Sequence, residues 1–270
     1  MTLSKTVQNI TIGLIAIGTA FAGFTAAIPQ ASALETISDL ESGDLVRGES
    51  FTAVYYYGAD GFRYVFPNDR TYFTWYDDFD GVKWISDSDM GSIQIGGNVT
   101  YKAGSKMIKI NSDPKTYAVD KGGVLRHVGS ESVATSLYGS AWNTMIDDVP
   151  DGFFTNYSIG DAIEDADDYN TEDAAASVDD INDDKGLVAP EEIVITDDGY
   201  EPIDVTIDIG QGVRFINNSS DKHNATADDL SWGTGTLQTG DDYIAVFDEV
   251  GTYPFFDGYD SSNTGAVYVE

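Results

Sequence analysis

The sequence contains no cysteine, and this excludes disulfide bonds, thiol catalysis, zinc–thiolate sites and iron–sulfur clusters. Basic residues are scarce, because 14 Lys and Arg stand against 46 Asp and Glu, for a formal net charge of -32. Such an acidic surface repels nucleic acid and anionic lipid, so we expect neither as a partner. The same charge destabilises the compact state unless ions screen it, which favours a saline habitat or a cation-rich surface layer over ordinary solubility.

Only one long hydrophobic run is present, at residues 10–28. It follows Lys5 and precedes a small-residue triplet at residues 31–33, an order typical of a secretory signal peptide. We therefore expect a signal peptide over residues 1–33 and a secreted, extracellular or cell-surface protein with no transmembrane domain after cleavage. An uncleaved membrane anchor is the alternative, because the run is nearly long enough to span a bilayer.

Motifs of common enzymes are also missing. The sequence has no nucleophile elbow, Walker loop, H-E-x-x-H or G-x-G-x-x-G pattern. Carboxylate pairs are too abundant in this composition for any one of them to indicate a glycosidase. We therefore expect a protein that is not an enzyme; a hydrolase has only generic acidic residues in its favour.

Residues 43–160 are rich in Tyr, Phe, Trp and Val, with turn signals about every ten residues, which predicts an aromatic-rich β module. One helix is expected over residues 131–146, after a Ser130 cap. Two hairpins, "DGFRYVF" and "KGGVLRHV", resemble each other and suggest a duplication in which Arg63 matches Arg126. Most aromatic side chains should fill the core, and any that face outward could stack on sugars or dock a partner protein.

The stretches "YYYGADGFRYVFPNDRTYFTWY" and "KMIKINSDPKTYAVDKGGVLR" resemble a secreted module of cell-surface proteins from ultrasmall, candidate-phyla bacteria. The resemblance implies a location rather than a chemistry.

Residues 161–188 then shift sharply to Asp, Glu, Ala and Asn. Because so few large apolar side chains cannot offset the entropy of ordering, we predict an acidic disordered linker there.

Residues 189–270 return to short alternating strands, expected at 193–196, 203–207, 213–217, 243–247, 253–256 and 266–269. So many short strands in about eighty residues indicate a β-sandwich. The segments "YEPIDVTIDIGQGVRFINNSSDKHNAT" and "LQTGDDYIAVFDEVGTYPFFDGYDSSNTGAVYVE" are similar to the two halves of the cupredoxin family, the plastocyanin-like blue-copper proteins. The fold class is thus mainly β: an aromatic-rich β (β+α) module, a linker and a cupredoxin-like Greek-key sandwich.

The resemblance places His223 at the family's upstream His ligand, Asp257 at its thiolate Cys, Asp260 at its second His and Asn263 at its weak axial Met. A blue-copper centre needs a covalent copper–thiolate bond, and this chain has no thiol. The resemblance and the substitutions together imply a degenerate copper site that stays colourless and redox-silent. A copper-binding electron-transfer or metal-handling cupredoxin with an unusual ligand set is the alternative.

The four positions now offer oxygen and one imidazole, which suit hard cations such as calcium better than copper. His223, Asp257, Asp260 and Asn263 are therefore a candidate weak cation site. Ordinary Asx-turn residues in the loop "DGYDSSNTG" are the alternative. We expect no cofactor, neither organic nor copper, with calcium as the alternative. A cell-surface protein, a glycan or divalent cations are the expected partners, in an interaction or structural role.

Overall fold

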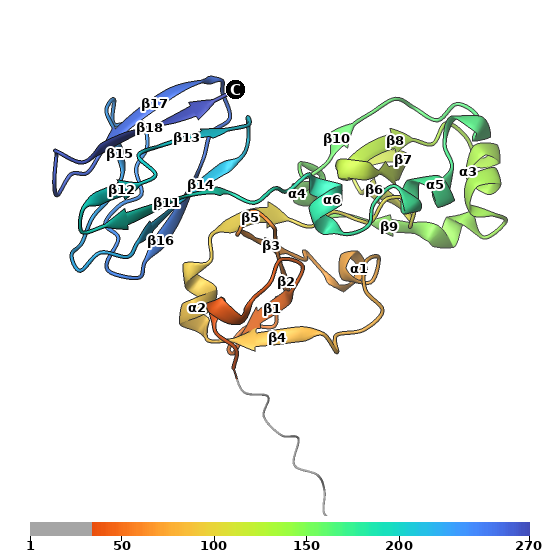
Figure 1. Ribbon diagram of the computed structural model, residues 1–270. Coiled ribbons are helices and arrows are strands. Elements are labelled where there is room, and N and C mark those ends of the chain that lie inside the picture. Colours follow the sequence, from red (N-terminus) through yellow and green to blue (C-terminus); the bar gives the residue numbers. More distant parts are fainter. Residues whose placement is uncertain (1–33) are drawn as a thin grey trace, which may run out of the picture. The chain divides into compact units, whose positions relative to one another are not determined.

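The computed structural model describes residues 34–270 of the chain (Figure 1). The signal peptide expected over residues 1–33 lies outside the described residues. All the elements given below lie in one compact unit of the chain. Within residues 34–270, no helix has the length and apolar character needed to cross a membrane.

The first folded region is a five-stranded sheet with short helices, drawn in orange and yellow in Figure 1. Its elements are η1 (Ile37–Asp39), β1 (Leu45–Gly48), β2 (Tyr55–Tyr57), β3 (Arg63–Val65), α1 (Asp69–Tyr72), β4 (Val82–Ile85), α2 (Asp87–Ser92) and β5 (Ile95–Asn98). The strand order is β4-β1-β2-β3-β5. Strands β1 to β3 form an antiparallel meander, whereas β4 and β5 pair parallel with β1 and β3.

The second region has the same topology. Its elements are β6 (Met107–Ile110), β7 (Asp113–Asp120), η2 (Lys121–Gly123), β8 (Val124–His127), α3 (Glu131–Tyr138), η3 (Trp142–Met145), β9 (Ile146–Asp148), α4 (Asp151–Phe154) and β10 (Ser158–Ile159). The strand order is β10-β8-β7-β6-β9. Strands β6 to β8 form the meander, and β9 and β10 pair parallel with β6 and β8.

The two regions also share their strand registers. Leu45 lies opposite Tyr56 in the first sheet, and Met107 lies opposite Ala118 in the second. Met107 therefore follows Leu45 in the sequence by the same number of residues as Ala118 follows Tyr56. The first helix after the meander begins at Asp69 in one region and at Glu131 in the other, which is the same offset. The duplication suggested by the sequence is therefore present as two repeats, which we call repeat 1 and repeat 2.

The residue match suggested by the sequence is wrong, however. Arg63 lies opposite Tyr57, and Leu125 lies opposite Val119, so Arg63 corresponds to Leu125 rather than to Arg126. Matching the two hairpins by their arginines shifts the strand register by one residue. Because the side-chain period of a strand is two, this shift exchanges the two faces of the sheet.

Both faces of each repeat's sheet are covered. Tyr56 packs in a core with Tyr64 and Tyr72, while its neighbours Tyr55 and Tyr57 pack on the opposite face. In repeat 2, Ala118 and its two neighbours alternate in the same way between two cores. Alternation along a strand explains this distribution, and most of the aromatic side chains are core residues, as the sequence predicts.

The helix expected over residues 131–146 is shorter than predicted. Ser130 caps α3 by accepting a hydrogen bond from the Val133 amide at 3.3 Å. The helix ends at Tyr138, because Gly139 takes a positive φ of 79°. The residues beyond it form the 3₁₀ helix η3 and then β9.

The acidic segment is folded, so the prediction of a disordered linker over residues 161–188 is wrong. It contains η4 (Ala166–Asp168), α5 (Thr171–Ala176) and α6 (Ile181–Lys185). Three of its few large apolar side chains, Ile163, Val178 and Ile181, are almost completely buried in the cores of the repeats. Its polar residues cap helices, as Asn170 and Asp180 do for α5 and α6. A count of apolar residues underestimates order here, because each of these three reaches a core.

We predict that Ile181→Ala lowers the free energy of unfolding of the chain by about 2–4 kcal/mol, as truncation of a fully buried Ile does. Val188→Ala is the matched control, because Val188 is half-exposed in the same segment and its truncation should have little effect. Urea denaturation measures both. Equal, negligible losses in the two variants would contradict the folded segment.

Two adjacent carboxylates of α6 should respond to pH with opposite sign. Asp184 accepts the Gly122 amide at 2.9 Å, and burial raises its pKa above the ordinary 3.8. Its contribution to stability is therefore largest at low pH and is lost as pH rises through the folded-state pKa. The Lys121 ammonium lies 2.7 Å from Asp183, and hydrogen bonds from Lys121 and the Asp179 amide lower the pKa of Asp183. Its contribution is present above pH 3.8 and is lost as pH falls below that value.

We therefore predict that, as pH rises, Asp184→Asn gains stability relative to the parent chain, whereas Asp183→Asn loses it. The relative loss of stability in Asp183→Asn should be complete once the pH reaches the ordinary pKa of a carboxyl group. The relative gain in Asp184→Asn should continue at pH values above it. Each variant serves as the control for the other, because both retain the helix and its length. Urea denaturation at a series of pH values measures the two trends. Parallel trends in the two variants would contradict the assignment.

The C-terminal region is a β-sandwich, drawn in teal and blue in Figure 1. Its strands are β11 (Glu191–Thr196), β12 (Gly199–Glu201), β13 (Asp204–Ile207), β14 (Gly212–Asn217), β15 (Thr226–Ala227), β16 (Asp242–Val246), β17 (Gly251–Phe256) and β18 (Thr264–Val269). One sheet has the order β12-β11-β14-β16 and the other β13-β18-β17-β15. Phe215 and Phe255, one from each sheet, meet in the core with ring centroids 5.3 Å apart. All six predicted strands are present, and β12 and β15 are additional.

Candidate functional site

The loop that carries His223 follows β14 and is held by a buried amide. Asn217, the last residue of β14, is completely buried and donates to the carbonyls of Asp221 and Leu237, both at 2.8 Å. Its side-chain oxygen accepts the amide and hydroxyl of Ser219 at 3.0 and 2.7 Å. His223 itself exchanges two backbone hydrogen bonds with Leu237. The imidazole therefore projects from a fixed backbone.

The other three candidate residues lie on the loop between β17 and β18. Asp257 directly follows β17, and its amide donates to the Asn263 carbonyl at 3.0 Å. The Asn263 amide in turn donates to the Asp260 carbonyl at 2.9 Å. Backbone hydrogen bonds thus close the loop into a compact turn.

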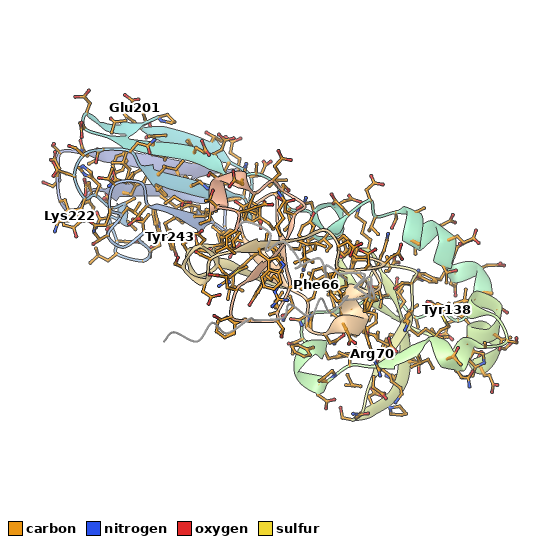
Figure 2. All side chains as sticks on the ribbon, turned by 90° about the horizontal axis from the view of Figure 1, so that it is seen from below. Phe66, Arg70, Tyr138, Glu201, Lys222 and Tyr243 are labelled. Atoms are coloured by element: carbon orange, nitrogen blue, oxygen red, sulfur yellow. The ribbon has the colours of Figure 1, made fainter. Side chains whose placement is uncertain are left out.

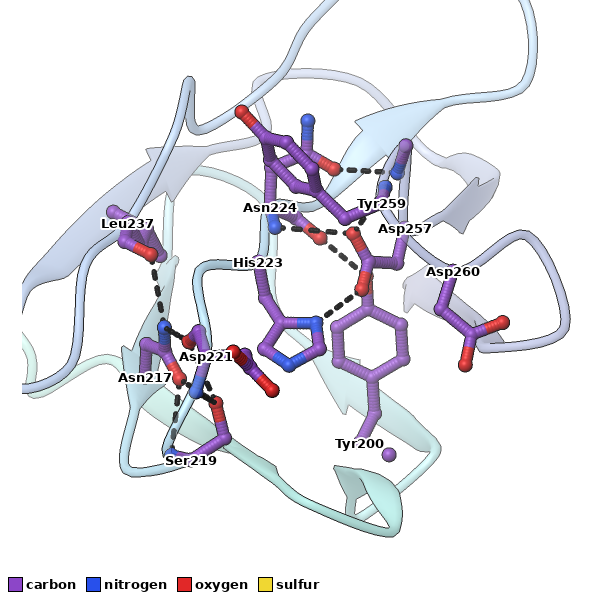
Figure 3. A network of polar contacts seen from close by, with 12 residues as sticks. Tyr200, Asn217, Ser219, Asp221, His223, Asn224, Leu237, Asp257, Tyr259 and Asp260 are labelled. Carbon is purple, nitrogen blue, oxygen red and sulfur yellow. Dashed lines mark hydrogen bonds and ion pairs between the residues drawn. The ribbon is translucent and has the colours of Figure 1, made fainter.

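His223 and Asp257 are in direct contact, as Figure 3 shows. The Nδ1 atom of His223 lies 2.5 Å from Oδ2 of Asp257. Asp257 is completely buried, and the side chain of His223 is 13% exposed. The second carboxylate oxygen of Asp257 accepts the amides of Tyr259 at 2.9 Å and Asn224 at 3.3 Å. Both oxygens are therefore engaged by protein donors.

Tyr200 and Asn224 enclose the pair. The Tyr200 hydroxyl donates to the Asn224 carbonyl at 2.5 Å, and the Asn224 side-chain oxygen accepts the Gly258 amide at 2.6 Å. Burial and the negative charge of Asp257 raise the pKa of Tyr200, so it remains a neutral donor. These contacts join the His223 loop to the Asp257 loop.

Asp260 and Asn263 do not bind His223. Oδ1 of Asp260 accepts the amide and hydroxyl of Ser262 at 3.1 and 2.6 Å, and these bonds hold the pKa of Asp260 below its ordinary value. Asn263 packs on Gly199, where a Cβ would lie 2.9 Å from its side-chain oxygen. Within residues 34–270, no group of three or more His, Asp and Glu side chains is arranged to hold a metal ion.

A blue-copper centre does not fit this arrangement. The Nδ1 atom of His223 is occupied by the carboxylate, and the loop supplies no sulfur atom, since the chain lacks cysteine and Met145 is the last methionine. A blue-copper centre requires two imidazoles and a thiolate. The residues present form instead a closed, hydrogen-bonded His–Asp pair.

Solved cupredoxin structures resemble part of this chain. A purple cupredoxin from Nitrosopumilus maritimus is 26% identical, covering 30% of this chain and 99% of its own, with a TM-score of 0.28. A Cu(I) structure of an amicyanin mutant is 24% identical, covering 30% and 82%, with a TM-score of 0.29. A Cu-containing nitrite reductase from Thermus scotoductus SA-01 is 20% identical, covering 31% and 23%, with a TM-score of 0.30. No protein-family model matches the chain, and no curated protein matches it. The fold class itself, mainly β and ending in a β-sandwich, follows from the sheets described above.

Sequence reasoning missed three residues that position the site: Tyr200, Asn217 and Asn224. Asn217 had a usable signal, since an amide at the inner-facing end of a strand needs partners when buried. Tyr200 and Asn224 had none, because their hydrogen bonds join segments 24 and 34 residues apart. Such pairings depend on how the strands of the sandwich are packed.

Proposed function

We propose that this chain is a secreted or cell-surface protein with a non-enzymatic, interaction or structural role, and that its cupredoxin-like sandwich has lost the copper centre. The observation that carries the proposal is the buried contact between His223 and Asp257. The sequence resemblance to cupredoxins aligns these two residues with copper ligands of that family. The carboxylate accepts hydrogen bonds from three protein donors, one of which is the imidazole. These bonds hold the two loops together. The carboxylate and the Nδ1 atom of His223 are thereby engaged, and the chain offers no thiolate for a blue-copper centre.

Other features support this role. The described residues hold three β regions with cores of their own, and the chain carries a formal net charge of -32, suited to an ion-rich exterior. The signal-like N-terminus, the absence of cysteine and the absence of enzyme motifs agree with it. In this proposal the sandwich contributes a stable module rather than an electron carrier.

Copper loading tests the proposal. The purified chain is incubated with Cu(II), desalted and examined by visible spectroscopy and metal analysis, with a matched series in calcium. We expect no intense visible charge-transfer band and less than stoichiometric copper, because no thiolate is available. A blue protein with one copper per chain that is reversibly reduced would overturn the proposal in favour of an electron-transfer or metal-handling role. Stoichiometric calcium that is lost in Asp260→Ala would instead establish the weak cation site.

A further inference from the structure

Each repeat carries a groove at the same place in its fold, between the approach to its second strand and the start of its first helix. Groove 1, in repeat 1, has a volume of about 460 Å³ and groove 2, in repeat 2, about 180 Å³. Most lining residues of groove 1 have a counterpart in groove 2 at one constant offset along the chain. The pairs are Thr52/Pro114, Ala53/Lys115, Val54/Thr116, Val65/His127, Phe66/Val128, Asn68/Ser130, Asp69/Glu131 and Tyr72/Ala134.

The offset between these pairs equals the offset between the strand registers of the two repeats, in which Leu45 corresponds to Met107. The groove is therefore a property of the repeat itself. The chemical character of two matched positions has been kept as well, a capping residue and a carboxylate. Each groove also contains an aromatic ring, but Phe79 and Trp142 are one residue out of that offset.

The floor of groove 1 is aromatic. Tyr72 and Phe79 stack with ring centroids 4.3 Å apart, and Phe66 meets the edge of Tyr72 at 5.0 Å. Tyr72 is buried, whereas Phe79 is 48% exposed and presents its ring to the groove. Figure 2 labels Phe66 on this repeat. In groove 2 the half-buried Trp142 supplies the ring.

The rim of each groove pairs a donor with an acceptor. The side-chain oxygen of Asn68 accepts the Thr71 amide at 2.9 Å, so its two N–H donors remain for a ligand. Ser130 caps α3 in the same way and keeps its hydroxyl proton. Next to them, Asp69 and Glu131 are exposed carboxylates, and within residues 34–270 no basic side chain pairs with either. A carboxylate beside a donor can bind two neighbouring hydroxyl groups.

We propose that each of the two grooves independently binds a segment of an uncharged, hydroxyl-rich chain, a neutral glycan. The ring that lines the groove stacks on the apolar face of a sugar, while the adjacent donor and carboxylate bind its hydroxyls. The formal net charge of -32 disfavours acidic glycans and other polyanions. This inference rests on the proposed interaction role and names its partner class.

The experiment titrates the chain by calorimetry with neutral β-1,4-linked hexasaccharides of glucose, xylose, mannose and N-acetylglucosamine. We expect at least one series to bind with a stoichiometry of two. Phe79→Ala and Asp69→Asn should weaken one site about tenfold, the size of an aromatic stacking contact or a good hydrogen bond. Glu131→Gln should weaken the other site and leave the first unchanged. Trp84→Ala is the control, because Trp84 is an exposed ring of repeat 1 outside the groove.

A stoichiometry of one would overturn the proposal that both grooves are binding sites. Absence of binding in every series would overturn the proposal that the ligand is a neutral glycan. A lysine-rich peptide that binds in a Phe79-dependent manner, with no sugar bound, would replace the glycan by a cationic protein partner. Reducing ends are measured in the same samples. Shortened oligosaccharides would overturn the non-enzymatic role whether or not the grooves bind, so the two proposals fail separately.

Discussion

Asp257→Ala is expected to lower the free energy of unfolding by about 3–5 kcal/mol, as removal of one partner from a buried charged pair does. Asp257 is fully buried and accepts hydrogen bonds from His223, Asn224 and Tyr259. Alanine would leave these three donors without a partner in the interior. Because the carboxylate joins two loops, the sandwich should lose stability without a change in the repeats. Urea denaturation followed by tryptophan fluorescence and circular dichroism measures the loss.

Asp260→Ala is the control for this prediction, since Asp260 lies in the same loop but is exposed and its side chain forms hydrogen bonds only with Ser262. Its effect should be small. Asp257→Asn should fall between the two, because an amide oxygen can still accept the Asn224 and Tyr259 amides. If Asp257→Ala is no more destabilising than Asp260→Ala, the pair does not clamp the two loops.

The melting temperature of the chain should rise by on the order of 10 °C between about 0.01 M and 1 M NaCl, equivalent to about 3–5 kcal/mol. The 46 acidic residues face only 14 basic ones, so self-repulsion is large when ions do not screen it. The Debye length falls from about 30 Å to about 3 Å over that range of salt. Scanning calorimetry across the series measures the effect.

A parallel series in sorbitol at matched osmolality separates screening from exclusion of solute from the protein surface. The sorbitol series should give a smaller rise. A melting temperature that is indifferent to salt would contradict the idea that this chain requires an ion-rich environment.

The sequence predicts much of the sandwich and less of the rest. Its six expected strands are all present, because short alternating runs bounded by turn residues specify strands locally. Composition alone wrongly predicted a disordered linker in the acidic segment. Average polarity over residues 161–188 is high, but Ile163, Val178 and Ile181 each reach a core formed by distant residues. Burial of single residues in a polar stretch depends on tertiary packing.

The candidate site was likewise predicted only in part from the sequence. The resemblance to cupredoxins selected His223 and Asp257, and the structure places them in contact. It does not bring Asp260 or Asn263 to His223, because a Ser262 hydroxyl and the Gly199 backbone are their nearer partners. Similarly, the duplication is visible in the sequence only as an echo between two hairpins. The strand registers reveal the constant offset between the repeats and the paired grooves, which no local pattern contains.

The most direct test of the central claim follows the ring nitrogens of His223 by ¹⁵N NMR during addition of Cu(I). The chain has two histidines, and a His127→Gln variant assigns the signals. The Nδ1 atom is bonded to Asp257, so the His223 signals should stay in place at equimolar copper and should shift only when Asp257 is replaced by alanine. A His223 signal that shifts and saturates at one copper per unaltered chain would contradict the closed His–Asp pair.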